Sequence, residues 1–236
     1  LMRSSAASDV YKRQNKYFIL ITLAFAVIYT SLGLTGGSRI YYAKYVLGDE
    51  MLNSTMTMFN YIPTILTIML IPVFTKRFGK IKALFVGFLF YAAGLVLEIA
   101  GPVNLPMIYT GLVLQGIGHA ALYSCLFAIV GDVVDYSEWK DGVREEGITY
   151  SVTSFGQKIG TGLGTAALGW ILAAGHYDGT AAVQSASAIF AIKGLFLYLP
   201  LVITVIVLII WYLFMGIDKI YPTVRKELDE RREKAE

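Results

Sequence analysis

The sequence predicts an all-α membrane protein with six transmembrane helices. Three observations lead to this fold class: 56% of the 236 residues are hydrophobic, only 16% are charged, and the mean hydropathy is +0.60. A soluble globular domain carries roughly a quarter charged residues. The shortage of charge therefore favours lipid as the surroundings of much of the surface, and the spacing of the apolar runs gives the number of helices.

Six apolar stretches in the chain are each long enough for one membrane helix. Such a helix needs about 20 mostly apolar residues to cross roughly 30 Å of hydrocarbon. In chain order, the stretches comprise residues 17–38, 56–75, 83–100, 107–130, 148–175 and 195–215. An even number of spans places both ends of the chain on one side of the membrane.

Lysine and arginine residues indicate which side that is. Sixteen of them precede the first stretch, lie in the second or fourth connection, or follow the sixth stretch, whereas three lie in the first and fifth connections. Because basic loops stay in the cytoplasm, we expect a multi-pass protein of the cell (inner) membrane with both ends cytoplasmic. The charge follows topology rather than a continuous basic face, which excludes nucleic acid as a partner.

Two terminal segments flank the membrane domain, which we place at residues 15–216. Residues 1–14 lack the apolar run of a signal peptide, and we interpret them as a non-native, adaptor-derived segment. Residues 217–236 are expected to form a charged cytoplasmic tail. Its acidic and basic residues are spaced i,i+4, as in Glu227 and Arg231, which is typical of a solvated helix.

The residue pattern offers little support for enzymatic chemistry. The sequence contains no glycine-rich phosphate loop, no His-Glu metal spacing and no serine-nucleophile motif. Its one cysteine, Cys125, has no second thiol with which to form a disulfide or a cysteine-based zinc site. We therefore expect a protein that is not an enzyme and binds no metal or cofactor of its own.

The fifth stretch has a polar face with a lysine near its middle. The polar residues recur at helical spacing: Ser151, Ser154, Lys158, Thr161 and Thr165. A second face carries glycines, which permit close helix packing: Gly156, Gly160 and Gly164. A lysine at mid-helix costs about 2.5 to 3.5 kcal/mol unless it meets water or a partner. A snorkelling lysine or a structural ion pair is the alternative, but the full stripe favours a helix that lines an aqueous cavity.

Polar residues in three other stretches suggest contacts inside the bundle. Gln115, His119 and Tyr123 follow one another at i, i+4 and i+8, which indicates a polar neighbour. A lone histidine there is more typical of a hydrogen-bonded packing residue than of a proton carrier. We expect the carboxylate of Glu98, near the end of its stretch, to reach the membrane interface, and Pro63 to kink the second stretch.

The connection between the fourth and fifth stretches carries the most specific motif. It reads DVVDYSEWKDGVREEG from Asp132 to Gly147 and is followed by a serine-rich stretch with one lysine, Lys158. This pattern resembles the D-x-x-D-Y-x-E-W-K-x-G-x-R-x-E-G segment of the glycoside-pentoside-hexuronide:cation symporter family, part of the major facilitator superfamily. The resemblance covers residues 16–236.

This resemblance implies the C-terminal half of a twelve-helix major facilitator fold. It implies secondary active symport of a sugar, glycoside or hexuronide with a cation, sodium or a proton, by alternating access. The implied partners are the sugar substrate, the lipid bilayer and a missing N-terminal six-helix half, in which the family binds the coupling cation. The second connection resembles the superfamily's D-R-x-G-R turn, with Lys76 in place of the aspartate.

The resemblance also implies a substrate site and a gate. Lys158 would bind a sugar hydroxyl or pair with a hexuronide carboxylate. Tyr123 would present its ring to the sugar, at a position where the family's best-known member has tryptophan. Secondary substrate contacts would come from Ser154, Gln115 and His119, and a cytoplasmic gate from Asp132, Asp135 and Arg144.

Two other functions stay open. One is an oligomeric six-helix channel or membrane scaffold that associates through the glycine face of the fifth stretch. The other is a major facilitator transporter of a non-sugar solute, which would need a cavity with fewer hydroxyl and amide groups than the fourth and fifth stretches supply.

Overall fold

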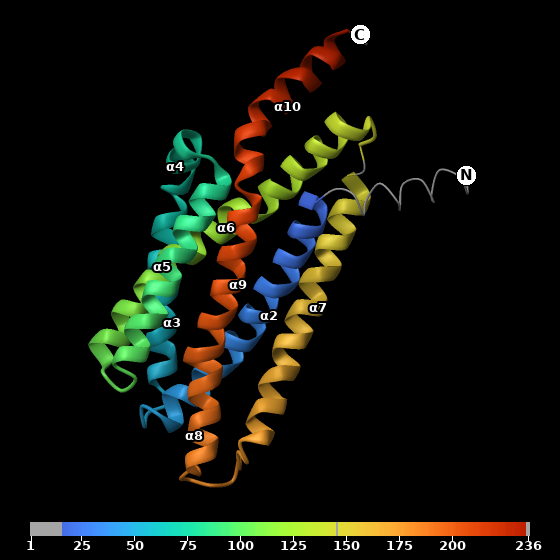
Figure 1. Cartoon of the computed structure of the whole chain (residues 1–236). Helices are drawn as coiled ribbons and strands as arrows, with labels where there is room; N and C mark the ends of the chain where they lie inside the picture. Colours follow the sequence, from blue (N-terminus) through green and yellow to red (C-terminus); the bar gives the residue numbers. More distant parts are fainter. Residues whose placement is uncertain (1–15, 145, 235–236) are drawn as a thin grey trace, which may run out of the picture.

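The protein is described by a computed structural model that covers residues 16–144 and 146–234. The interpretation of residues 1–14 thus lies outside the described residues. All regular structure in the described part is helical, and the long helices run side by side in one elongated bundle (Figure 1). The elements are α2 (Lys16–Tyr45), α3 (Leu52–Ile68), α4 (Ile71–Phe78), α5 (Lys80–Ala100), α6 (Leu105–Asp141), α7 (Glu146–Ala174), α8 (Ala186–Lys193), the π-helical η1 (Gly194–Tyr198), α9 (Leu199–Phe214) and α10 (Gly216–Glu233).

Fewer helices qualify as membrane spans than the six predicted. By length and composition, four described helices can cross a membrane: α2, α5, α6 and the continuous rod Ala186–Phe214. The bent pair α3 and α4 adds a fifth if it counts as one span. The remaining predicted stretch, the fifth, is α7, whose 29 residues are long enough. It does not qualify because glycine, serine, threonine and Lys158 reduce its hydropathy.

The bend in the second predicted stretch does not lie at Pro63. That residue lies inside α3, and the 55° break falls between Ile68 and Ile71. Pro72 occupies the first turn of α4, where its missing N–H needs no partner and its fixed φ suits a helix start. The second proline, not the first, marks the point at which the chain changes direction.

Glycine faces bring two pairs of helices into close contact. The face predicted on α7 packs against α2: a Cβ added to Gly160 would lie 2.5 Å from the Ala26 carbonyl oxygen, and one on Gly33 would lie 2.7 Å from that of Thr161. Between α5 and α6, a Cβ on Gly118 would lie 2.6 Å from the carbonyl oxygen of Gly87. Since α2 covers the glycine face of α7, that face is not free to join a second copy of the chain.

Two apolar clusters fill the bundle, and a set of polar side chains lies between them. One cluster contains Phe25 and Trp211, and the other contains Leu112 and Phe196. The polar side chains between the clusters are all buried, and we call them the buried polar layer: Asn60, Thr64, Glu98, Gln115 and His119. This layer supports the faces on which the candidate site residues lie.

Helix α6 is longer than the sequence pattern suggested. The charged motif was expected to form a connection after residue 130, but the helix continues through it to Asp141. No glycine or proline interrupts the chain between Gly131 and Gly142. Gly142 adopts a left-handed conformation with φ of 72°, which ends the helix. The gate candidates Asp132 and Asp135 are therefore helical residues held on a rigid element.

The charged tail is also more than a solvated helix. α10 continues from the end of α9 and contacts the ends of α5 and α6 (Figure 1). Ile217, Val224 and Leu228 are buried on one face of it. The predicted Glu227 and Arg231 pair forms at 4.0 Å on its exposed side.

Candidate functional site

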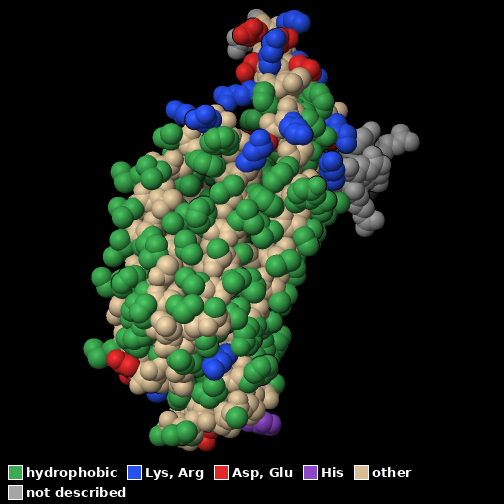
Figure 2. Space-filling model, turned by 60° about the vertical axis from the view of Figure 1, so that its left-hand side comes forward, with side chains coloured by type: hydrophobic (Ala, Val, Ile, Leu, Met, Phe, Trp, Pro, Cys, Tyr) green, Lys and Arg blue, Asp and Glu red, His purple; other side chains and the backbone are tan. Residues whose placement is uncertain are grey.

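Charged side chains are concentrated at one end of the molecule. Figure 2 shows lysine, arginine, aspartate and glutamate gathered around α10, above a long body covered largely by hydrophobic side chains. We call this the basic end: it is where α2 and α5 begin and α6 ends. The distribution fits a membrane protein whose apolar band contacts lipid and whose charged end contacts water.

Arg144 joins three acidic side chains at the basic end. Its Nη1 lies 2.9 Å from Asp135 Oδ1 and 2.7 Å from Glu138 Oε2, and its Nε lies 3.2 Å from Glu146 Oε2. The hydrogen bonds that Arg144 donates to Glu138 and Asp135 raise its pKa above the ordinary value, so its positive charge is fixed. The structure thus brings Asp135 and Arg144 together, across the turn that connects α6 to α7.

Asp132 does not join that group. Its Oδ1 accepts a hydrogen bond from Lys80 Nζ at 2.6 Å, and it is 5% exposed. Lys80 is the first residue of α5. It is also the last residue of the turn KRFGK (residues 76–80) in the second predicted connection. The three gate candidates therefore belong to two ion-pair systems: Asp132 pairs with Lys80, and Asp135 pairs with Arg144.

Helix α10 ties both systems together. The Tyr221 hydroxyl donates to Asp135 Oδ2 at 2.9 Å, and the indole N–H of Trp139 donates to Glu227 at 2.6 Å. Asp218 accepts hydrogen bonds from the backbone N–H groups of Ile81 and Lys82, at 3.1 and 3.2 Å. Burial raises the pKa of Asp218. The apolar spacing of α10 was a readable signal for this contact, but the charge content of the tail obscured it.

Lys158 and Ser154 lie on the exposed face of α7, roughly midway along the helix. Lys158 makes no hydrogen bond or ion pair with any residue in the described ranges. This favours an exposed polar face over a structural ion pair within the chain. A free ammonium group at membrane depth requires water or another protein surface beside it.

Tyr123 on α6 is the other exposed candidate, with 45% of its surface accessible. Its hydroxyl lies within electrostatic reach of Tyr29 on α2. Tyr29 also borders α7, since a Cβ added to Gly160 would lie 3.0 Å from the Cβ of Tyr29. Tyr29 thus lies between the helices that carry Tyr123 and Lys158, and no periodicity in the sequence marked it.

Unlike Tyr123, Gln115 and His119 are buried. Gln115 is 5% exposed and donates its amide to Glu98 Oε1 at 2.7 Å. His119 Nδ1 lies 3.3 Å from Asn60 Oδ1, and the centre of its ring lies 5.8 Å from that of the tilted Tyr123 ring. Glu98 is fully buried, so the expectation that it reaches the interface was wrong. Its side chain turns inward because α6 offers Gly111 and Gln115 opposite it.

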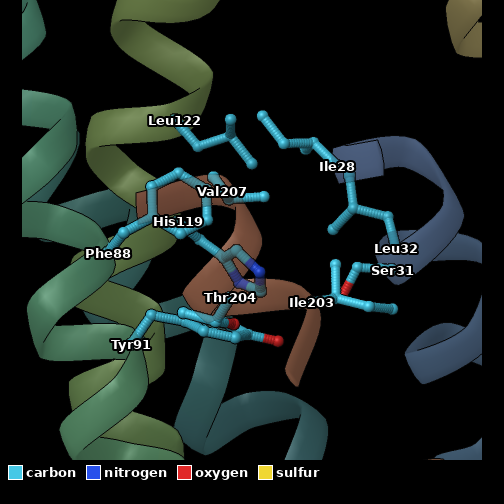
Figure 3. A pocket seen from close by; sticks show the side chains of 10 residues that line it. All are labelled: Ile28, Ser31, Leu32, Phe88, Tyr91, His119, Leu122, Ile203, Thr204 and Val207. Carbon is cyan, nitrogen blue, oxygen red and sulfur yellow. The ribbon is translucent and has the colours of Figure 1, made fainter. Parts of the chain in front are cut away.

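A small cavity adjoins the buried polar layer. Figure 3 shows the rings of His119 and Tyr91 and the side chain of Thr204 around it, with apolar side chains from α2 and α9 on the other sides. Its volume of about 20 Å³ suits one water molecule. The cavity is far too small for a sugar, so the substrate candidates are those on the exposed faces.

Arg39 is a polar residue inside the bundle that the sequence did not reveal. The first predicted stretch ends at residue 38, after Gly36 and Gly37, but α2 continues to Tyr45. Arg39 therefore enters the bundle, where its Nη1 donates to Thr57 Oγ1 at 3.2 Å. Its guanidinium group lies within electrostatic reach of Glu98, Tyr61 and Tyr123.

Together these features define a class of protein: a multi-pass membrane protein whose described part is all-helical. Residues 12–219 match the model of the MFS/sugar transport protein family. The chain belongs to this family of transporters and is not an enzyme. The resemblance to glycoside-pentoside-hexuronide:cation symporters is confirmed at this level.

Curated relatives agree with the family assignment. An isoprimeverose transporter of Lactiplantibacillus pentosus is 32% identical over 225 residues, which are 93% of this chain and 46% of that protein. A glucuronide carrier protein homolog of Escherichia coli is 28% identical, over 94% of this chain and 48% of its own length. A putative 2,3-dihydroxypropane-1-sulfonate exporter of Salmonella typhimurium is 31% identical, over 82% and 42%. The chain spans about half the length of the relatives it matches.

Proposed function

We propose that this chain forms the C-terminal six-helix half of a twelve-helix major facilitator transporter. In this proposal α7 is a span as well and brings the number to six, with its glycine face on α2 and its polar face on a central cavity. Both ends of the chain, and the basic end of the molecule, lie in the cytoplasm. The excess of lysine and arginine at the basic end favours this orientation. The coupling cation binds in the other half.

The single observation that carries this proposal is the exposed, unpaired Lys158 halfway along α7. Lipid would penalise the ammonium group by about 2.5 to 3.5 kcal/mol, so a water-filled cavity between two halves is the better environment. Substrate sites of transporters with this architecture lie near the membrane midplane, between the repeats. The half-length match to the relatives supports the same arrangement.

The proposed activity is symport of a sugar, glycoside or hexuronide with a cation by alternating access. Lys158 binds a hydroxyl or carboxylate of the substrate, and Tyr123 presents its ring to the apolar face of the sugar. Ser154 is a further contact on α7. Gln115 and His119 act from behind Tyr123, where their burial places them.

The ion pairs of the basic end serve as the cytoplasmic gate in this mechanism. Arg144 with Asp135, and Lys80 with Asp132, hold the ends of α5, α6 and the start of α7 in one arrangement. Substrate and cation shift the population toward the state in which these helix ends part from the other half.

A second candidate substrate is a small hydroxylated sulfonate. It is favoured by the names of two relatives, each a putative 2,3-dihydroxypropane-1-sulfonate exporter. An anionic headgroup would pair with Lys158, and the hydroxyl groups would use the serine and threonine residues of α7. Competition between a neutral glycoside, a hexuronide and this sulfonate for the same binding site separates the candidates.

Lys158→Gln in the full-length transporter tests the proposal. It keeps the length of the side chain and removes the charge, so substrate binding should weaken at least about tenfold, roughly 1.4 kcal/mol, at normal membrane expression. Lys219→Gln, which changes an exposed lysine of α10, is the matched control and should bind normally. Unchanged affinity in Lys158→Gln would overturn the substrate assignment.

A further inference from the structure

Glu98 is the acidic side chain of the buried polar layer. It is 0% exposed and lies in the last turn of α5. Oε1 accepts the hydrogen bond from Gln115, whereas Oε2 is buried with no hydrogen-bond partner among the described residues. The side chain passes over Gly111 of α6, where an added Cβ would lie 2.6 Å from Glu98 Cγ. The carboxyl group is thus an integral part of the interface between α5 and α6.

The groups around Glu98 leave its charge unmatched. From α2 it faces Arg39 and Tyr42, from α5 itself Tyr91, and from α6 Gln115. The rod of η1 and α9, also packed on α5, contains tyrosine as its only titratable residue type. Arg39 is the one cation within electrostatic reach, yet no ion pair of 4.0 Å or less forms between the two described side chains.

Arg39 itself is engaged elsewhere. Its Nη1 donates to Thr57 on α3, and its Nε is buried with no partner among the described residues. Two complementary groups, a carboxyl oxygen and a guanidinium N–H, are therefore both buried without a partner among the described residues. An ionised carboxylate in this position would lack donors on one oxygen, and such burial is costly unless the group is neutral or paired.

We propose that Glu98 is a proton-binding site of this chain, with the proton on Oε2 while Arg39 is held by Thr57. When Arg39 leaves Thr57 and approaches Glu98, the O–H bond breaks. The proton passes to water, both electrons of the bond stay on Oε2, and the guanidinium group balances the new carboxylate. Proton exchange is thereby coupled to movement of α2 against α3 and α5, at a position separate from Lys158. The proposal does not depend on the identity of the substrate.

Infrared spectroscopy of the full-length protein in lipid bilayers tests the site directly. The wild type should show the carbonyl stretch of a protonated carboxylic acid at neutral pH. Glu98→Gln should lose this band, and the control Glu50→Gln, which changes a solvent-exposed carboxylate near the end of α2, should keep it. A spectrum that is the same in the wild type and Glu98→Gln would overturn the proposal.

Two variants that leave Glu98 in place test the role of Arg39. Arg39→Gln removes the competing cation, so the acid band should persist to a pH roughly one unit higher than in the wild type. Thr57→Val frees the guanidinium group, so the band should disappear at a lower pH. A merely structural role would move neither titration. Titrations identical to the wild type in both folded variants would overturn the coupling to Arg39.

Discussion

The basic end and the buried polar layer differ in how many partners their charged or ionisable side chains have. At the basic end, Arg144 contacts three carboxylates and Glu138 also pairs with Arg232 at 3.0 Å, so each group has more than one partner. In the buried layer, Glu98 has one hydrogen bond. Water and neighbouring charges can replace a lost contact at the basic end, but nothing replaces one in the interior. We therefore expect single substitutions to have larger effects in the layer.

The largest effect is expected from Gln115→Leu. It removes the hydrogen bond of a fully buried carboxyl group, and an unsatisfied buried polar group costs about 1–3 kcal/mol. The free energy of unfolding of the purified protein, from denaturant titration, should fall by that amount. Gln157→Leu on α7 is the control. Equal stability of both variants would contradict the contrast between the two regions.

Tyr123 lies at the border of the buried layer and the exposed face, and it should give the next largest effect. Tyr123→Ala should weaken substrate binding about tenfold, because the ring face is lost, whereas Tyr123→Phe should retain most of the affinity. Equilibrium binding to membranes measures both. Equal loss in the two variants would mean that the hydroxyl group is the contact.

Arg144 sharpens the comparison at the basic end. Arg144→Ala should reduce active accumulation more than equilibrium binding. Exchange of Arg144 with Asp135 should restore part of the transport, with a coupling above the roughly 0.2 to 1 kcal/mol of exposed pairs. Exchange with Asp132 should restore little, since Asp132 pairs with Lys80. Normal accumulation by Arg144→Ala would remove the gate from the mechanism.

The smallest effect is expected on the outer face of α10. Glu230 lies 3.9 Å from Lys226 in an exposed i,i+4 pair, and such pairs contribute about 0.3–0.5 kcal/mol. Glu230→Gln should leave the unfolding free energy within about 0.5 kcal/mol of the wild type. A loss above 1 kcal/mol, on the order of the neutral hydrogen-bond contribution, would show that solvent exposure does not explain the contrast.

Much of the fold was predictable because a membrane helix is encoded by a local feature of the sequence, a long apolar run. Long apolar runs and the distribution of lysine and arginine gave the membrane class, and the glycine spacing of α7 gave its packing face. The motif around Asp132 and Arg144 gave the family. The length of α6 was missed because charged residues were taken to indicate a connection, although they can also cover a helix that extends into water.

The interior of the site was much less predictable. Whether Glu98 turns toward lipid headgroups or toward Gln115 depends on which residues of α6 lie opposite it, and a single sequence does not contain that register. Arg39 was missed because Gly36 and Gly37 mimic a helix end, while packing against α7 keeps α2 helical through them. Lys158 and Tyr123 are both exposed, and their roles in substrate binding stay predictions.

The π-helical turn η1 determines where an alignment of this chain with its relatives can contain a gap. The N–H of Leu199 bonds to the Gly194 carbonyl oxygen, five residues back, so this turn accommodates one residue more than an α-helical turn. Deleting one residue there would restore a regular helix and leave the later residues on the same faces, whereas a deletion between Leu199 and Trp211 would rotate the residues after it by about 100°. Trp211 and Phe214, both 0% exposed, would then leave the core. A one-residue alignment gap is therefore admissible within residues 194–198 but not within Leu199–Phe214.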